Sequence, residues 1–484
     1  MLKQIKTVGL TAVVSLSLLA VGCKKELSND GSGNYDRAKT AGFTNPTQSI
    51  PVNASGVIQD SFDGNSTDNI INLTSNKVWL IDGVSYVPSG KTLKIPAGTI
   101  LSSGVDKSYT GTQTNPDTGL PETVTKPIHG VLVIVKGAKI DAVGTEALPI
   151  VFTSPKAPGS RAAGDFGGII VLSNAPTNQP TTKVIEGLPT PPSGVDVTFG
   201  GSTSTANSGS LQYVRIEYAG FKLFADNEIN GLTLGGVGSG TLLDHIQVTY
   251  SADDSFEFFG GTVNATNLVA AGSDDDDFDF DNGYTGTIEF AVGLKALNST
   301  HSTSGSPATS DANGIESDNE ATTPFSATPR TLPVLKHFTV LGTSANNSVL
   351  KLGARLRRNS GFDIQNSVIA GFPIGVTNEN SASGTFTNNV LHAYSLTGGA
   401  VTPGSNAASA NTYLAFGTVG GLSPFYVDDA TAYNVGQLVP RSTSPALLAP
   451  PANTPYAGAI QPGTAATNTW LKNWTLFTPQ TKVY

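Results

Sequence analysis

Short segments in which apolar and polar residues alternate recur along the chain about every 22 residues. Leu243–Tyr250 aligns with Ala265–Ala270 at an offset of 22 residues, and Leu211–Tyr218 aligns with Leu243–Tyr250 at an offset of 32. Alternation with a period of two is typical of a strand with one buried face. Strands at this spacing predict a parallel β-helix, a solenoid with one coil per repeat. Further segments of this kind are Thr287–Gly293, Lys336–Gly342, Ile364–Gly371 and Thr387–Leu391.

The composition fits an all-β solenoid. Only 13% of the residues are charged and 54 are glycine, whereas about 25% charged residues are usual in a globular protein. A β-sandwich would favour strand spacings of about 8–12 residues. The longer offsets therefore indicate coils that carry loop insertions, one of them around His301–Asn313.

Residues at equivalent places in successive coils are expected to stack. Asn267, Asn366 and Asn388 are candidates for an asparagine ladder inside the coil. The five histidines lack the spacing of metal ligands. Two of them, His245 and His337, take equivalent places in the repeat, so we expect them to be stacking residues.

The chain begins with the pattern of a secretory signal peptide. Lys3 and Lys6 precede the apolar run Val8–Gly22, which is shorter than a membrane span of about 20 residues. The run ends in Leu19-Ala20-Val21-Gly22-Cys23, which resembles the lipobox of bacterial lipoproteins. The resemblance implies that residues 1–22 are a lipoprotein signal peptide and that acylated Cys23 anchors the protein to outer-membrane lipid. The alternative is an ordinary signal peptide followed by a chance cysteine.

The polar stretch that follows predicts a flexible tether over residues 23–50. Its start, Lys24-Lys25-Glu26, resembles the surface-export signals of Bacteroidetes lipoproteins and implies display on the cell surface, with a periplasm-facing anchor as the alternative. We assign residues 51–400 to the β-helix and 401–484 to C-terminal coils and a cap, in which Trp470–Tyr484 covers the last coil.

Strands punctuated by Pro and Gly turns carry a family resemblance. They occur at Tyr86–Ile100 and Gly164–Ile169, and the same kind of sequence includes Asp253–Val263. These segments resemble the bacterial secreted and lipid-anchored proteins of pectin-lyase-like architecture that are common in Bacteroidetes. The resemblance spans Ile71–Gln480 and implies a right-handed single-stranded parallel β-helix. It implies a fold and a location more than a reaction, because many members have no assigned activity.

The negative charge is concentrated in one part of the chain. Leu223–Leu294 contains thirteen Asp and Glu residues and no Lys or Arg, and without these acids the formal net charge of −9 becomes +4. Asp253–Gly261 aligns with Asp275–Gly283, again at an offset of 22 residues. Gly314–Asn319 and Ile229-Asn230 fall in the same frame. The acidity therefore follows the coil repeat.

Residues one coil apart in a β-helix lie about 4.8 Å apart. The alignment predicts an outward column of Asn230, Glu257, Asp279 and Glu316, and beside it an apolar column of Ile229, Phe256, Phe278 and Ile315. Stacked carboxylates repel one another, and a bound Ca²⁺ would compensate the repulsion. The alternative is a solvated acidic face whose carboxylates cap backbone N–H groups. The candidate metal ligands are Asp275, Asp276, Asp277, Asp279 and Asp281. The candidate binding residues are Asp253, Asp254, Glu257, Glu316 and Asp318.

Three cations share one face of the segment Leu350–Arg357, further along the chain: Lys351, Arg355 and Arg357. Leucines at positions 350, 352 and 356 alternate with them, and Lys351 is expected to follow Glu316 in the outward column. The functional interpretation is an anion-binding groove in which these three residues are catalytic, as in Ca²⁺-assisted polysaccharide lyases of this architecture. The alternative is an electrostatic ladder that offsets the neighbouring acids.

The sequence leaves two functions open. The first is a non-catalytic cell-surface lipoprotein whose β-helix face binds a glycan, a nutrient or an outer-membrane protein partner, with Ca²⁺; the second is a Ca²⁺-assisted polysaccharide lyase or hydrolase. A pI near 5.1 gives no basis for binding nucleic acid. Leu234–Gly240 is expected to be a turn between coils rather than a phosphate cradle, and Tyr284 is expected to be an exposed ring able to stack on a sugar.

Overall fold

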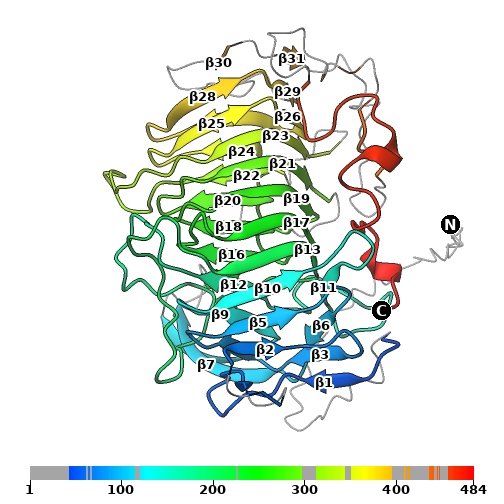
Figure 1. Cartoon of the computed structure of the whole chain (residues 1–484). Helices are drawn as coiled ribbons and strands as arrows, with labels where there is room; N and C mark the ends of the chain where they lie inside the picture. Colours follow the sequence, from blue (N-terminus) through cyan, green and yellow to red (C-terminus); the bar gives the residue numbers. More distant parts are fainter. Residues whose placement is uncertain are drawn as a thin grey trace, which may run out of the picture. The chain divides into compact units, whose positions relative to one another are not determined.

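The described part of the chain forms stacked coils of β-strand, numbered in chain order in Figure 1. The computed structural model describes residues 43–60, 64–65, 68–114, 120–224, 227–296, 312–343, 350–394, 408–409, 412–414, 435–440, 444, 446 and 456–484. The predicted signal peptide, Cys23 and most of the predicted tether lie outside these residues. Most of the predicted insertion around His301–Asn313 does so too.

Two large sheets form the walls of the coils, and every strand pairing within them is parallel. The nine-stranded sheet contains β4 (Val84–Val87), β9 (Val131–Ile134), β12 (Gly168–Leu172), β16 (Leu232–Gly235), β18 (Phe256–Phe259), β20 (Phe278–Asp281), β22 (Ile315–Ser317), β24 (Leu352–Leu356) and β27 (Ile374–Asn378).

The eighteen-stranded sheet contains β1 (Thr47–Ser49), β2 (Ile70–Asn72), β3 (Val78–Ile81), β5 (Thr92–Ile95), β6 (Ile100–Ser103), β10 (Lys139–Val143), β11 (Ile150–Thr153), β13 (Gly209–Glu217), β17 (Leu242–Thr249), β19 (Ala265–Ala271), β21 (Thr287–Leu294), β23 (Val334–Leu341), β25 (Gly361–Gln365), β26 (Val368–Phe372), β28 (Ser383–Thr387), β29 (Val390–Ala393), β30 (Ala408–Ser409) and β31 (Thr412–Leu414). Two antiparallel hairpins project from the coils, β7 (Lys107–Thr114) with β8 (Pro121–Ile128), and β14 (Phe221–Phe224) with β15 (Asn227–Ile229). Within the described residues the helices are two 3₁₀ turns, η3 (Ala466–Asn468) and η4 (Pro479–Thr481).

The strand register confirms the predicted parallel β-helix, which is right-handed. Leu243 of β17 lies opposite Ala265 of β19, and Phe256 of β18 lies opposite Phe278 of β20. Both pairs are 22 residues apart in the sequence. The inward rings stack from coil to coil, with the ring centroids of Phe256 and Phe278 5.5 Å apart. The coil interior is therefore a continuous apolar core.

A column of residues with left-handed backbone bends the strands of the eighteen-stranded sheet. β17, β19 and β23 contain His245, Asn267 and His337 at φ values of 54°, 59° and 56°, and Asn366 and Asn388 separate the later strand pairs at 49° and 55°. Asparagine tolerates this conformation better than most residues. The three predicted ladder asparagines share the column, although other residues occupy the coils between Asn267 and Asn366.

The two histidines of this column stack as predicted. His245 lies against Tyr213 with ring centroids 4.4 Å apart, and His337 lies against Phe290 at 5.1 Å. His337 is buried, and its burial lowers its pKa. Packing against aromatic rings therefore defines the environment of both side chains.

One local expectation is wrong, and another is right except at its start. Tyr284 is fully buried: its hydroxyl donates to the carbonyl of Val263 at 2.8 Å and its ring packs against Phe258 and Phe280, because the turn after β20 folds the ring into the coil. In the expected turn Leu234–Gly240, the first two residues end β16, and the chain turns from Gly236, where φ is 56°, to Gly240.

The C-terminal segment lies along the side of the coils. The prediction that Trp470–Tyr484 covers the last coil is wrong, since these residues contact β13 and β17 (Figure 1, red). The backbone N–H of Leu476 donates to Gln247 Oε1 at 2.8 Å, and the Leu476 carbonyl accepts from Gln247 Nε2 at 2.9 Å. The Tyr484 hydroxyl donates to Glu217 at 2.5 Å. Buried polar groups of β13 and β17 thus have partners in this segment. Among the described residues, no helix has the length and apolar character needed to cross a membrane.

Candidate functional site

An outward column of side chains on the nine-stranded sheet carries the acidic character expected from the repeat. Glu257 of β18, Asp279 of β20 and Glu316 of β22 are successive register partners. The column continues to Arg355 of β24 rather than to Lys351, so the expected place of Lys351 is wrong. The insertions between β22 and β24 change the coil length, which removes the 22-residue frame on which that expectation relied.

The upstream end of the column also differs from the expectation. Thr233 and not Asn230 is the register partner of Glu257. The expectation failed because Ile229-Asn230 and Leu232-Thr233 have the same apolar–polar order. Ile229 instead pairs with Phe221 in the β14–β15 hairpin. The side chain of Asn230 still reaches the column, since its Nδ2 donates to Glu257 Oε2 and its Oδ1 accepts from the Asp254 amide at 3.1 Å.

The column opens into a pocket of about 140 Å³ that is lined by nine carboxylates and one arginine. Most of the carboxylates come from β18, β20, β22 and the loops that enter β18 and β20. Two come from insertions, Glu186 between β12 and β13 and Glu228 in β15. The lining residues are Glu186, Glu228, Asp253, Asp254, Glu257, Asp275, Asp276, Asp279, Glu316 and Arg357.

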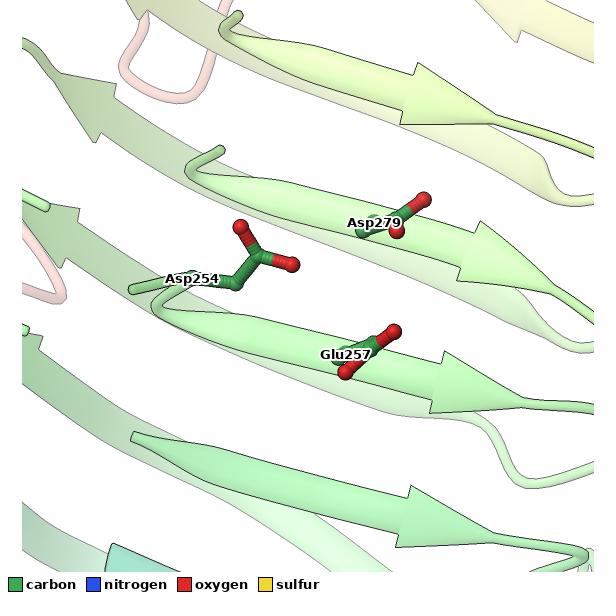
Figure 2. A group of neighbouring side chains, drawn as sticks. All are labelled: Asp254, Glu257 and Asp279. Carbon is green, nitrogen blue, oxygen red and sulfur yellow. The ribbon is translucent and has the colours of Figure 1, made fainter. Parts of the chain in front are cut away.

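Two groups of three carboxylates in this pocket have the spacing of metal ligands, and they share Asp254. Asp254, Glu257 and Asp279 form one group, in which the ligand oxygens lie within 4.8 Å of one another (Figure 2). Asp254, Asp275 and Asp276 form the other group by the same measure. The chain can therefore offer carboxylate oxygens from two successive coils to one cation.

Hydrogen bonds between coils hold these carboxylates in place. Asp254 Oδ1 accepts from the Asp276 amide at 2.7 Å, and Asp276 Oδ1 accepts from the Asn313 amide at 2.5 Å. Asn313 Nδ2 then donates to Glu316 Oε2 at 2.9 Å. In contrast, Asp279 Oδ1 is buried and accepts no hydrogen bond. A buried carboxylate oxygen without a donor is a position that a cation would satisfy.

The carboxylates of the pocket resist ionisation. Burial, and then the charges of neighbouring acids, raise the pKa values of five groups well above their usual range: Asp253, Asp254, Glu257, Asp276 and Asp279. Like charges crowded away from water favour the protonated forms. A divalent cation would reverse the effect, because it stabilises the ionised carboxylates.

Most of the predicted site residues line the pocket. Of the predicted metal ligands, Asp275, Asp276 and Asp279 do so. Of the predicted binding residues, Asp253, Asp254, Glu257 and Glu316 do so. Three predicted residues lie outside the lining: Asp277, Asp281 and Asp318.

Each of these three acids has other partners. Asp277 is fully buried with Lys295, at 3.4 Å between Oδ1 and Nζ, and its pKa rises to about 6 because of burial. Burial and Asp318 raise the pKa of Asp281 to about 7. Asp318 accepts from Arg357 Nε at 2.7 Å.

Cations reach the acidic segment from just outside it. Lys222 Nζ lies 3.6 Å from Glu228 Oε1 and 3.7 Å from Asp253 Oδ1. Lys222 immediately precedes the Lys- and Arg-free segment and Lys295 immediately follows it. The charge pattern inside the segment therefore gives no sign of these two lysines. Glu186 was also missed, because it belongs to an insertion with no counterpart in the repeat.

The three candidate lyase residues differ in their surroundings. Arg357 lines the pocket and pairs with Glu316, while Arg355 pairs with Glu316 at 3.7 Å and with Glu379 at 3.4 Å. Lys351 precedes β24 and is not among the residues that line the pocket. The acidic and basic groups thus share one face of the β-helix.

A parallel β-helix with an acidic pocket on one sheet defines the class of this protein. Residues 64–418 match the family model described as a pectate-lyase-like beta helix domain, and the chain belongs to this family. Comparisons with curated proteins and with solved structures found no significant match.

Proposed function

We propose that this protein binds an anionic carbohydrate through Ca²⁺ held in the acidic pocket. The pocket, with nine carboxylates and one arginine among its lining residues, is the observation that carries the proposal. Membership of the pectate-lyase-like family supports a carbohydrate as the ligand. The bound Ca²⁺ would link the acidic wall to a carboxylate of the sugar.

Ca²⁺ suits this pocket better than Mg²⁺. Ca²⁺ accepts six to eight oxygen ligands in flexible geometry, whereas Mg²⁺ requires a near-ideal octahedron. Asp254, Glu257 and Asp279 come from two coils and are placed by strand stacking rather than by one dedicated loop. Their oxygens, together with those of Asp275 and Asp276, give an irregular set of donors that favours the larger cation.

Binding without catalysis is the primary proposal. A lyase needs a deprotonated group that can accept a proton from the substrate. An arginine guanidinium stays protonated in proteins and so is a poor candidate for this role. Arg357 is held by Glu316 and Asp318, and Arg355 lies between Glu316 and Glu379. Both guanidinium groups therefore act as counterions of fixed carboxylates. The alternative, a Ca²⁺-assisted lyase or hydrolase, is favoured by the position of Arg357 in the pocket wall.

The proposal includes a location. The lipobox-like sequence that ends at Cys23 supports attachment to outer-membrane lipid, and Lys24-Lys25-Glu26 supports display at the cell surface. Such a location would give the β-helix access to external glycans. Labelling of cells with an alkyne fatty acid should mark the protein and should leave Cys23→Ser unmarked. Equal labelling of both would contradict acylation at Cys23.

Two successive assays test the function. Calorimetric titration of the chelator-treated protein with CaCl₂ should give heat and a higher melting temperature, whereas the absence of both contradicts the cation site. A glycan array in Ca²⁺, followed by an absorbance assay for unsaturated products on each binder, then separates the alternatives. Ca²⁺-dependent binding without product supports the binding protein. Release of unsaturated product supports the lyase.

A further inference from the structure

Two of the chain's own cations stand among the pocket acids. Lys222 of β14 lies beside Glu228 and Asp253, both of which line the pocket. Arg357, which follows β24, pairs with Glu316 of β22. The pocket carboxylates thus already draw cationic side chains toward them, from an inserted hairpin and from a later coil.

The two cations are held in different ways. Arg357 Nε donates to both carboxylate oxygens of Asp318 at 2.7 and 3.0 Å, and this acid lies outside the pocket lining. Arg358 donates to the same carboxylate at 2.5 Å. Arg357 is therefore fixed by contacts that do not depend on what the pocket contains.

Lys222 is partly exposed and lies farther from its two pocket acids. Its distances of 3.6 and 3.7 Å to Glu228 and Asp253 exceed the 2.7–2.9 Å or so of a short charge-assisted hydrogen bond. Its side chain is 40% exposed, whereas that of Asp253 is 10% exposed. A lysine ammonium is a strongly hydrated point charge on a flexible stem. It can therefore reach solvent by rotation of its own side chain while Asp253 stays in place.

We propose that Lys222 is a displaceable counterion of the acidic pocket, which balances Asp253 and Glu228 until a divalent cation binds. The incoming cation repels the ammonium, which moves into solvent and leaves both carboxylates to the cation. This inference rests on the proposed function, because it requires the pocket to bind a divalent cation. It adds a residue that sets the affinity without being a ligand.

The role of Lys222 has two linked consequences. Removal of the ammonium removes a competitor, so the divalent cation should bind more tightly. The same removal takes a counterion from buried acids, so the cation-free protein should be less stable. A cation that binds only the folded state stabilises it by mass action, so bound Ca²⁺ should restore the stability that the variant lost. A purely structural role for Lys222 would instead lower stability with and without the cation.

The test uses the full chain, treated with chelator and titrated with CaCl₂ in a calorimeter at pH 8. Lys222→Met should bind Ca²⁺ about tenfold more tightly than the wild type, a shift expected from removing one nearby charge in a medium of intermediate dielectric constant. Lys139→Met is the matched control, because Lys139 is an exposed residue of β10 outside the pocket lining. Lys222→Arg, which keeps the charge, should bind close to the wild type.

Thermal melting completes the test. Lys222→Met should melt at a lower temperature than the wild type in chelator, and the difference should disappear in saturating CaCl₂. Equal or weaker Ca²⁺ binding by Lys222→Met overturns the inference and leaves the proposed function intact. A melting deficit that persists in CaCl₂ also overturns it. No Ca²⁺ binding by the wild type would overturn the proposed function itself.

Discussion

Glu316 and Arg355 are register partners on β22 and β24, and Arg355 Nη1 lies 3.7 Å from Glu316 Oε2. At this step the outward column changes from acid to base. Glu257 and Asp279 precede Glu316 in the column, and Thr377 follows Arg355. The acidic part of the face therefore ends at a cation that the chain itself supplies.

Arg355 is expected to stabilise the coils on either side of it. Arg355→Gln leaves Glu316 and Glu379 without this partner, and the free energy of unfolding should fall by about 2 kcal/mol, below the cost of breaking a fully buried pair because Glu379 is partly exposed. Chemical denaturation measures the change. Arg355→Lys, which keeps the charge, should recover part of the loss. Equal stability of Arg355→Gln and the wild type would show that the ion pairs contribute nothing net.

Asp254 belongs to both carboxylate groups of the pocket, so it should dominate cation binding. Asp254→Asn should weaken Ca²⁺ binding about 100-fold in calorimetry, because the change removes one charge from both carboxylate groups found among the described residues. Asp141→Asn, on β10 and outside the pocket lining, is the matched control and should bind as the wild type does. Unchanged binding by Asp254→Asn would place the cation elsewhere.

The cation-free protein should lose stability as the pH rises. The folded pKa values of five pocket acids are raised, as are those of Asp277 to about 6 and Asp281 to about 7, while unfolded carboxyl groups titrate near pH 4. Between pH 4 and 7 the folded state therefore holds more protons than the unfolded state, and stability falls with increasing pH. Burial lowers the pKa values of His337 and His392, which opposes this trend.

Melting curves in chelator at pH 5 and pH 8 measure this dependence. The melting temperature should be lower at pH 8, and CaCl₂ should restore most of the difference. Ca²⁺ affinity should correspondingly decrease from pH 8 to pH 5, because protons compete for the same oxygens. A protein that melts higher at pH 8 than at pH 5 in chelator would contradict the raised carboxyl pKa values.

The Tyr484 hydroxyl should be one of the contacts through which the C-terminal segment stabilises β13. Tyr484→Phe removes the donor to Glu217, which is fully buried, and should lower the free energy of unfolding by about 1–3 kcal/mol. Urea denaturation measures the loss, with Tyr109→Phe on the β7–β8 hairpin as a matched change away from this segment. The Thr153 hydroxyl, which donates to Glu217 at 2.8 Å, would remain in place. An unchanged midpoint would show that Thr153 and Arg215, which lies 3.3 Å from Glu217, suffice for this carboxylate without the tyrosine.

Much of the site follows from the 22-residue repeat. Glu257 and Asp279 lie opposite each other because their coils have equal length, and Phe256 and Phe278 stack inside for the same reason. The period of two places neighbouring residues on opposite faces, so the acids project outward wherever the phenylalanines project inward. These relationships depend on spacing along the chain, which a single sequence contains.

The pocket itself depends on insertions of unequal length. Glu186, Glu228 and Lys222 approach Asp253 and Asp254 from a loop and a hairpin that interrupt the repeat, and their positions come from the packing of those insertions against the coils. Insertions of unequal length between β22 and β24 also explain why Arg355, and not Lys351, follows Glu316 in the column.

The amino-acid sequence by itself therefore determined the parallel coils, the outward direction of Glu257 and Asp279 and the concentration of negative charge, because these follow from local periodicity. The tertiary structure alone decided that Glu186 and Glu228 close the pocket, that Lys222 lies beside Asp253, and that Tyr484 reaches Glu217. Each of these contacts joins residues whose separation fits no repeat. Folding of the intervening chain, and not sequence spacing, brings them together.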